Sequence, residues 1–168
     1  MKTNQKLVVA LFALLAVAVC QAGFAQVVPF KARGDNAIYS QPFIGGDGST
    51  SSLGKATHMG KVYGEGQALP TVGNNWETVG DYTLTAANGD TIRMNGGGTV
   101  DVIPLGGGLF YAVWTGEFNV VGGTGRFANV GPGPAPIAVV AINNPFTFAG
   151  PIWTYSWTLT GKINLGKK

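Results

Sequence analysis

The sequence predicts an all-β domain, a single small antiparallel barrel that follows a signal peptide. Three observations lead to this prediction. Segments in the C-terminal half alternate apolar and polar residues with period two, no stretch after the N-terminal apolar run has the 3.6-residue period of an amphipathic helix, and glycine-rich turns separate the segments. Short strands joined in this way are typical of a closed meander or of a sandwich.

The N-terminus has the three-part layout of a secretory signal peptide. Two lysines precede an unbroken apolar run, Leu7–Val19, and Gly23 and Ala25 stand at the −3 and −1 positions of a cut before Gln26. The run is shorter than the roughly 20 residues that a membrane-spanning helix needs, so we expect cleavage rather than a retained anchor. We therefore assign residues 1–25 to the signal peptide, and expect a secreted protein, periplasmic or extracellular.

Cys20 is the only cysteine. A bacterial lipoprotein would keep it as a lipidated first residue, but that signal needs a small residue just before the cysteine, and Val19 stands there. If Cys20 leaves with the signal peptide, by a cut after Ala25 or after the alternative Ala22, the mature chain has no thiol. Disulfides, cysteine catalysis and thiolate metal sites are then excluded.

The mature part, residues 26–168, has the length of one domain and little charge. The whole chain carries +3, and removal of the two lysines that precede the apolar run leaves +1. Charged residues make up 11% of the chain, against roughly 25% in an average domain. Apart from Lys167 and Lys168 at the end there is no basic cluster, so we expect no nucleic-acid partner.

Two segments show the period-two pattern of half-buried strands most clearly, Leu109–Val121 and Ile152–Leu165. Each has one face rich in aromatic and apolar residues, and we expect that face to point into the domain. In the first segment this face holds Phe110, Ala112, Trp114, Gly116, Phe118 and Val120. In the second it holds Trp153, Tyr155, Trp157, Leu159, Gly161 and Ile163.

Earlier segments fit the strand pattern less well. Thr57–Glu65 would place His58 on a face with Ala56 and other small or apolar residues. Trp76–Ala87 and Thr91–Ile103 flank Asn88-Gly89-Asp90, a hairpin turn in which Asn and Gly accept positive φ.

Glycine and proline mark the remaining turns. Pro104 is expected to end its strand before a turn at Gly106–Gly108, and Gly122–Gly125 predicts another turn. Gly45–Ser52, rich in Gly, Ser and Thr, is predicted to be a mobile loop. Gly131–Pro136 alternates Pro and Gly and cannot donate a regular strand ladder, whereas Val27–Ala32 is predicted to be an edge strand or a docked arm.

Val120–Phe127, Val-Val-Gly-Gly-Thr-Gly-Arg-Phe, resembles the strand-turn-strand signature of dirigent proteins and allene oxide cyclases, which share an eight-stranded antiparallel barrel. The runs Ala56–Gly66 and Thr83–Asp90 resemble uncharacterised secreted bacterial proteins related to that superfamily. The resemblance implies a barrel of about eight strands. It carries over only turn and packing residues: Gly122, Gly123, Thr124, Gly125 and Phe127.

No catalytic residue is carried over from either family. Dirigent proteins continue after the phenylalanine with Ala-Arg-Gly, whereas Ala128-Asn129-Val130-Gly131 here lacks the arginine. Their opening strand rich in His and Asp, and the acidic and aromatic constellation in the cavity of allene oxide cyclases, have no counterpart that can be placed.

His58 is the only histidine. In the mouth of a barrel it could hydrogen-bond or move a proton near neutral pH, and the alternative is a satisfied core or rim histidine. Without a second histidine we expect no metal site and no cofactor. The carboxylates are scattered singly; Asp90 is assigned to a turn, and Arg126 is expected to pair with a carboxylate across strands.

The aromatic residues are the strongest feature. Pointing inward, they would fill the barrel or line a pocket for a flat or apolar ligand. Pointing toward lipid, they would be typical of an outer-membrane barrel, but the chain ends Leu165-Gly166-Lys167-Lys168 without a terminal aromatic, and we expect no stable membrane insertion. The candidate lumen residues are His58, Phe110, Trp114, Phe118, Trp153, Tyr155 and Trp157.

Three classes of function follow. The first is binding of a small apolar or aromatic ligand without catalysis, which we favour. The second is a cyclase, isomerase or dirigent-like guide that steers a reactive intermediate in the cavity, and the third is a structural component of an envelope or matrix. A lumen packed solid would leave room only for the third, and two or more ionisable groups converging in an open lumen would favour the second.

Overall fold

A computed structural model of the chain describes residues 25–71 and 74–166. Residues 1–24, which hold Cys20 and almost all of the predicted signal peptide, lie outside the described residues, as do Lys167 and Lys168. No helix long and apolar enough to span a membrane occurs in the described part.

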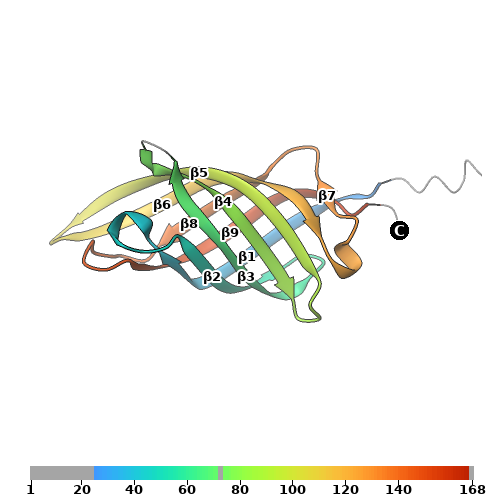
Figure 1. Ribbon diagram of the computed structural model, residues 1–168, viewed down its shortest axis with the longest axis horizontal. Helices are drawn as coiled ribbons and strands as arrows, with labels where there is room; N and C mark the ends of the chain where they lie inside the picture. Colours follow the sequence, from blue (N-terminus) through green and yellow to red (C-terminus); the bar gives the residue numbers. More distant parts are fainter. Residues whose placement is uncertain (1–24, 72–73, 167–168) are drawn as a thin grey trace, which may run out of the picture.

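Within these residues, eight antiparallel strands form a closed barrel (Figure 1). Each strand pairs with the next along the chain, and the last pairs with the first, so the all-β barrel prediction is confirmed and the sandwich alternative is wrong. The strands are β1 (Val27–Ser40), β2 (Ser49–Ala56), β3 (Gly60–Thr71), β4 (Asn74–Ala86), β5 (Thr91–Gly106), β6 (Leu109–Gly123), β8 (Ile137–Asn143) and β9 (Ile152–Asn164).

β1 closes the barrel, so the prediction of an edge strand or docked arm at its start is wrong. It pairs with β9 from Val27 to Ser40 and with β2 over its second half. A bulge between Gly34 and Ala37, with Asn36 at φ 53°, inserts one extra residue. Because side chains alternate with period two, the bulge moves the inward face from even to odd positions and keeps the apolar side chains inside.

Two other boundaries differ from those predicted. The expected loop at Gly45–Ser52 ends at Gly48, since Ser49–Ser52 already pair with β3 as part of β2. The polar composition of this segment predicted a loop. It forms a strand instead, because the inward side chains of Thr50 and Ser52 hydrogen-bond to tyrosine hydroxyls in the lumen. β5 runs past Pro104, although proline has no N–H to donate to a neighbouring strand. No bond to β4 is needed there, because the pairing of β4 with β5 stops at Thr99.

Three short elements complete the described chain: the 3₁₀ turns η1 (Pro42–Ile44) and η2 (Gly125–Phe127), and β7 (Gly131–Pro132). Only these two residues of the Pro/Gly segment form a ladder, with the end of β9, as its composition predicts.

Buried apolar side chains gather in one half of the lumen. We call it the terminal end, because β1 begins and β9 ends there (Figure 1, right). Burial of each large side chain stabilises the fold by about 1.5–3 kcal/mol. The largest fully buried side chains are Phe30, Leu84, Ile92, Met94, Ile137, Leu159 and Ile163.

Candidate functional site

The aromatic faces of β6 and β9 are the inner ones, as their period-two pattern predicts. Trp153 and Trp157 are 3% and 4% exposed, whereas Thr154 and Thr158 between and beside them are exposed. Phe110, Trp114 and Phe118 of β6 and Tyr155 of β9 also face the interior and are partly buried.

A cavity of about 110 Å³ occupies the lumen beyond the packed core. Five predicted lumen residues line it, namely Trp114, Phe118, Trp153, Tyr155 and Trp157. Apolar side chains such as Val139 and Ala141 complete much of the wall. Its other polar side chains are Tyr39, Gln41, Thr50, Thr78, Tyr82 and Asn143.

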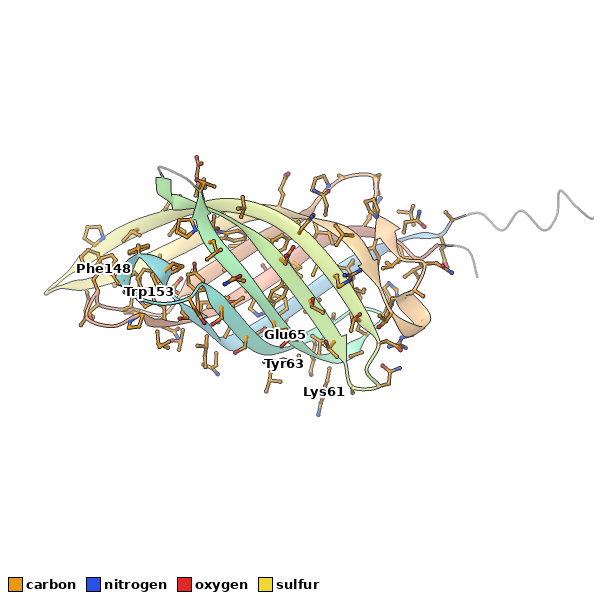
Figure 2. All side chains as sticks on the ribbon, viewed as in Figure 1. Lys61, Tyr63, Glu65, Phe148 and Trp153 are labelled. Atoms are coloured by element: carbon orange, nitrogen blue, oxygen red, sulfur yellow. The ribbon has the colours of Figure 1, made fainter. Side chains whose placement is uncertain are left out.

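Phe110, the sixth predicted aromatic, belongs to a cap at the distal end of the barrel rather than to the cavity wall. We define the cap as Phe43 of η1, Phe110, Phe146 and Phe148, which pack on Trp153. The centroids of the Phe146 and Trp153 rings are 3.9 Å apart, and those of Phe110 and Phe148 are 4.7 Å apart. Figure 2 shows Phe148 and Trp153 together at this end.

His58 does not face the lumen, so its prediction as a lumen residue is wrong. It lies exposed in the turn between β2 and β3 at φ 66°, and its Nε2 is 3.0 Å from the Pro29 carbonyl oxygen. The prediction assumes that side chains alternate between two faces through His58. The alternation stops before this residue, because β2 ends at Ala56 and a turn does not place side chains on alternate faces.

Tyrosine hydroxyls in the cavity wall are held by small polar groups of neighbouring strands. Tyr39 donates to the Ala68 carbonyl at 2.9 Å, the Tyr82 hydroxyl is 2.7 Å from Ser52 Oγ, and the Tyr155 hydroxyl bonds Thr50. Burial raises the pKa of Tyr39 to about 12, with a further contribution from Tyr155. Burial also raises the pKa of Tyr82 and of Tyr155, so the three phenols keep their protons to higher pH than an exposed tyrosine does.

Inward-facing glycines make room for the rings. Gly96 lies directly opposite Phe118, and a Cβ on it would come within 2.5 Å of Phe118 Cδ1. A Cβ on Gly64 would come within 2.1 Å of the Tyr82 hydroxyl. Sequence reasoning missed these pairs, although a glycine at an inward position across from an aromatic residue is a recognisable signal once register is known.

Four buried polar atoms of the cavity wall have no hydrogen-bond partner among the described residues. They are the acceptor Gln41 Oε1 and the donors Asn143 Nδ2, Trp153 Nε1 and Trp157 Nε1. An unpaired buried polar atom costs about 1–3 kcal/mol, and such atoms in native proteins usually meet water or a ligand. Gln41 and Asn143 were missed from the sequence, although each continues the inward positions of its strand.

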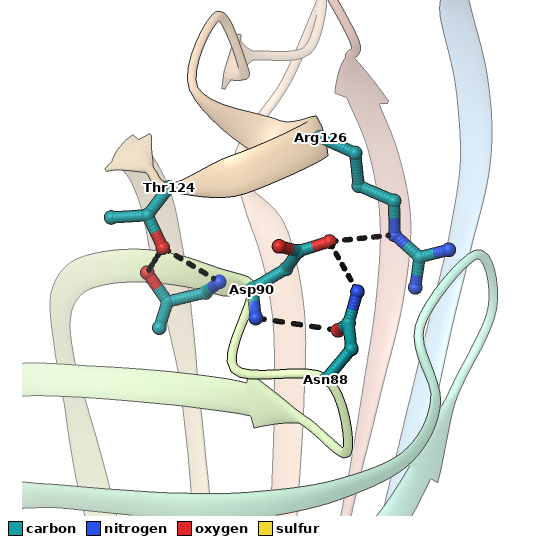
Figure 3. A network of polar contacts seen from close by, with 5 residues as sticks. Asn88, Asp90, Thr124 and Arg126 are labelled. Atoms are coloured by element: carbon teal, nitrogen blue, oxygen red, sulfur yellow. Dashed lines mark hydrogen bonds and ion pairs between the residues drawn. The ribbon is translucent and has the colours of Figure 1, made fainter.

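The turn that follows β6 is a structural feature at the terminal end. Asp90 accepts from Asn88 Nδ2 at 2.8 Å and lies 3.3 Å from Arg126 Nε (Figure 3). Arg126 therefore has the predicted carboxylate partner, but the pair joins η2 to the turn between β4 and β5 rather than two strands. Thr124 N donates to the Thr91 carbonyl at 3.0 Å.

Phe127 contributes more to holding this turn than the ion pair does. Arg126 is 52% exposed, so its ion pair is worth about 0–1 kcal/mol. Phe127 is 2% exposed, and its burial is worth about 1.5–3 kcal/mol. The predicted turn residues therefore stabilise the fold, and none of them lines the cavity.

No three His, Cys, Asp or Glu side chains gather as a metal site within residues 25–71 and 74–166. Comparison with family models, with curated proteins and with solved structures finds no match to this chain.

Proposed function

We propose that this protein binds a small apolar or aromatic ligand in the distal half of the barrel. One observation carries the proposal: an aromatic-walled cavity of about 110 Å³ lies in the lumen of the barrel. A cavity of about 150 Å³ in another protein holds benzene, so the ligand, or the part of it that enters, has the size of about one six-membered ring.

The wall composition supports binding over proton transfer. Among the described lining residues, the titratable side chains are three tyrosines, Tyr39, Tyr82 and Tyr155, each with a raised pKa and an engaged hydroxyl. A cyclase or guide in this cavity would have to act by shape and by hydrogen bonds from neutral groups. A purely structural role leaves the cavity and its four unpaired polar atoms without explanation.

Benzene is a suitable first probe, because it tests the cavity without any polar contact. We expect a Kd of about 1 mM or tighter, equivalent to at least about 4 kcal/mol of binding free energy. Saturating benzene should therefore raise the urea midpoint of unfolding, and it should alter the fluorescence of the cavity tryptophans.

A matched pair of variants on β8 locates the site. Ala141 lines the cavity, whereas Ala138 on the same strand is exposed on the outer face. Ala141→Phe should fill the cavity and abolish benzene binding, and Ala138→Phe should leave it unchanged. Absence of any benzene effect on the wild-type protein, or its persistence in Ala141→Phe, would refute the proposal.

We also propose that the protein is secreted and that it is related to the dirigent and allene oxide cyclase superfamily. The eight-stranded closed barrel and the position of Gly122–Phe127 at a turn support a relationship to the dirigent and allene oxide cyclase superfamily. A superposition of an experimental structure on members of those families, with matching strand order and bulges, would test it.

A further inference from the structure

The unpaired polar atoms of the cavity define the chemistry of a ligand more narrowly than its volume does. Resting on the binding function proposed above, we propose that the ligand carries an uncharged amide group at the distal end of the cavity. Its carbonyl oxygen would accept from Asn143 Nδ2 and Trp153 Nε1, and its N–H would donate to Gln41 Oε1.

Three of the four atoms belong to residues on adjoining stretches of chain, within two positions of Trp153 in the strand register. Trp153 lies on β9 opposite Tyr39 of β1, and the chain continues to Gln41, whose N–H donates to the Pro151 carbonyl at 2.6 Å. On the other side of β9, Asn143 of β8 is opposite Tyr155. Gln41 and Asn143 therefore flank Trp153 from the two neighbouring strands, each within two positions of it.

The fourth atom, Trp157 Nε1, belongs to a deeper level. Trp157 is four residues further along β9, and its indole lies over Gly34. It is therefore not counted among the atoms that would bind the amide group.

Two donors and one acceptor match an amide. A carbonyl oxygen has two lone pairs and accepts from two donors, and the neighbouring N–H supplies the donor that Gln41 Oε1 needs. The site is also buried, with Gln41 and Trp153 each 3% exposed, so a ligand group that hydrogen-bonds these atoms relieves the cost of leaving them unpaired.

A charged ligand fits this wall less well. No Lys, Arg or His is among the residues that line the cavity, so a carboxylate would be buried without a cation and would face the Gln41 oxygen. No Asp or Glu lines it either, so an ammonium group would lack an anion. Burying an unpaired charge is far more costly than burying a neutral amide that is hydrogen-bonded.

Three flat molecules, each built on one six-membered ring, test the proposal on the wild-type protein; 2-pyridone and 2-pyrone have the same number of heavy atoms. 2-Pyridone offers a carbonyl and an N–H, 2-pyrone replaces the N–H by an oxygen, and benzene has neither group. We expect 2-pyridone to bind about tenfold more tightly than either of the others, equivalent to about 1.4 kcal/mol, measured by calorimetric titration.

Variants of the amide side chains assign the contacts. Gln41→Leu removes the acceptor and should reduce the preference for 2-pyridone over 2-pyrone to about twofold or less. Gln67→Leu is the control, because Gln67 is exposed on the outer face of β3. Asn143→Leu should weaken the binding of both carbonyl rings, and Asn95→Leu on the outer face of β5 should not.

The outcomes separate this inference from the proposed function. Benzene binding with no advantage for 2-pyridone would overturn the amide inference and leave the cavity as an apolar site whose polar atoms meet water. Equal affinity for 2-pyridone and 2-pyrone would overturn it too, since the N–H would then find no acceptor. Failure of all three rings to bind would refute the binding function itself.

Discussion

Gly34 and Trp157 lie directly opposite each other on β1 and β9, and the indole of Trp157 occupies the space that a side chain at position 34 would need. A Cβ on Gly34 would be 2.5 Å from Trp157 Nε1 and 2.7 Å from the Leu53 carbonyl oxygen. Both contacts are shorter than Cβ atoms tolerate. The absence of a side chain at Gly34 therefore leaves the space that the indole of Trp157 occupies.

Gly34→Ala should therefore destabilise the barrel by about 1–3 kcal/mol, the usual range for overpacking a tight site. Replacing glycine by alanine in an open strand usually stabilises, because it restricts the unfolded chain, so the sign of the effect is diagnostic. Gly150→Ala is the control, since no atom lies within 4 Å of a Cβ built there. Urea unfolding measures both variants, and a gain in stability for Gly34→Ala would contradict the packing described.

Trp157→Ala should cost about 3–5 kcal/mol, the range for truncating a large buried aromatic. Thr158→Ala, one residue along and exposed on the outer face, should cost well under about 1 kcal/mol. The contrast follows from the alternation of side chains along a strand. Urea melts in detergent-free buffer measure the difference; equal and small losses would show that Trp157 is not part of the core.

Alkaline pH should weaken the fold through the cavity tyrosines. The pKa of Tyr39 rises from 10.0 to about 12, and burial shifts the pKa of Tyr82 and Tyr155 in the same direction. Above pH 10 the unfolded chain loses phenolic protons that the folded protein keeps, so unfolding releases protons and stability falls as pH rises toward 12. Below pH 10 this contribution is fully present.

The urea midpoint measured from pH 8 to pH 12 checks this expectation, together with the absorbance of tyrosinate in the folded protein. Tyr39→Phe should reduce the slope of the midpoint against pH, and Tyr63→Phe on the outer face serves as the control for loss of a tyrosine. Tyrosinate absorbance that develops fully near pH 10 while the protein is still folded would contradict the burial of these phenols.

Export should remove residues 1–25 and leave Gln26 as the first residue. The intact mass of the protein recovered from the periplasm or medium checks this, and Ala25→Leu should block the cut because signal peptidase needs a small residue at that position. Recovery of a species that retains Cys20 with the added mass of a lipid would show instead that the chain is a lipoprotein.

Local pattern was sufficient for much of the inner surface. Alternation along β6 and β9 places Trp114, Phe118, Trp153 and Trp157 inside, because side-chain direction in a strand depends only on parity and requires no knowledge of the partner. The same rule failed at His58, where the strand had ended. At Ser49–Ser52 the loop prediction rested on composition instead, and it was wrong because the polar side chains of this strand bind tyrosine hydroxyls.

By itself, the sequence determined the all-β class, the hairpin turns and the inward aromatic faces, since these depend on neighbours a few residues apart. Only the tertiary structure decided that β1 pairs with β9, that Gly34 meets Trp157, and that Gln41, Asn143 and Trp153 share one wall. The relationships that involve Gly34 and Gln41 join residues more than a hundred positions apart. They depend on barrel closure and on the bulge at Asn36, which set the register across strands and leave no trace in local periodicity.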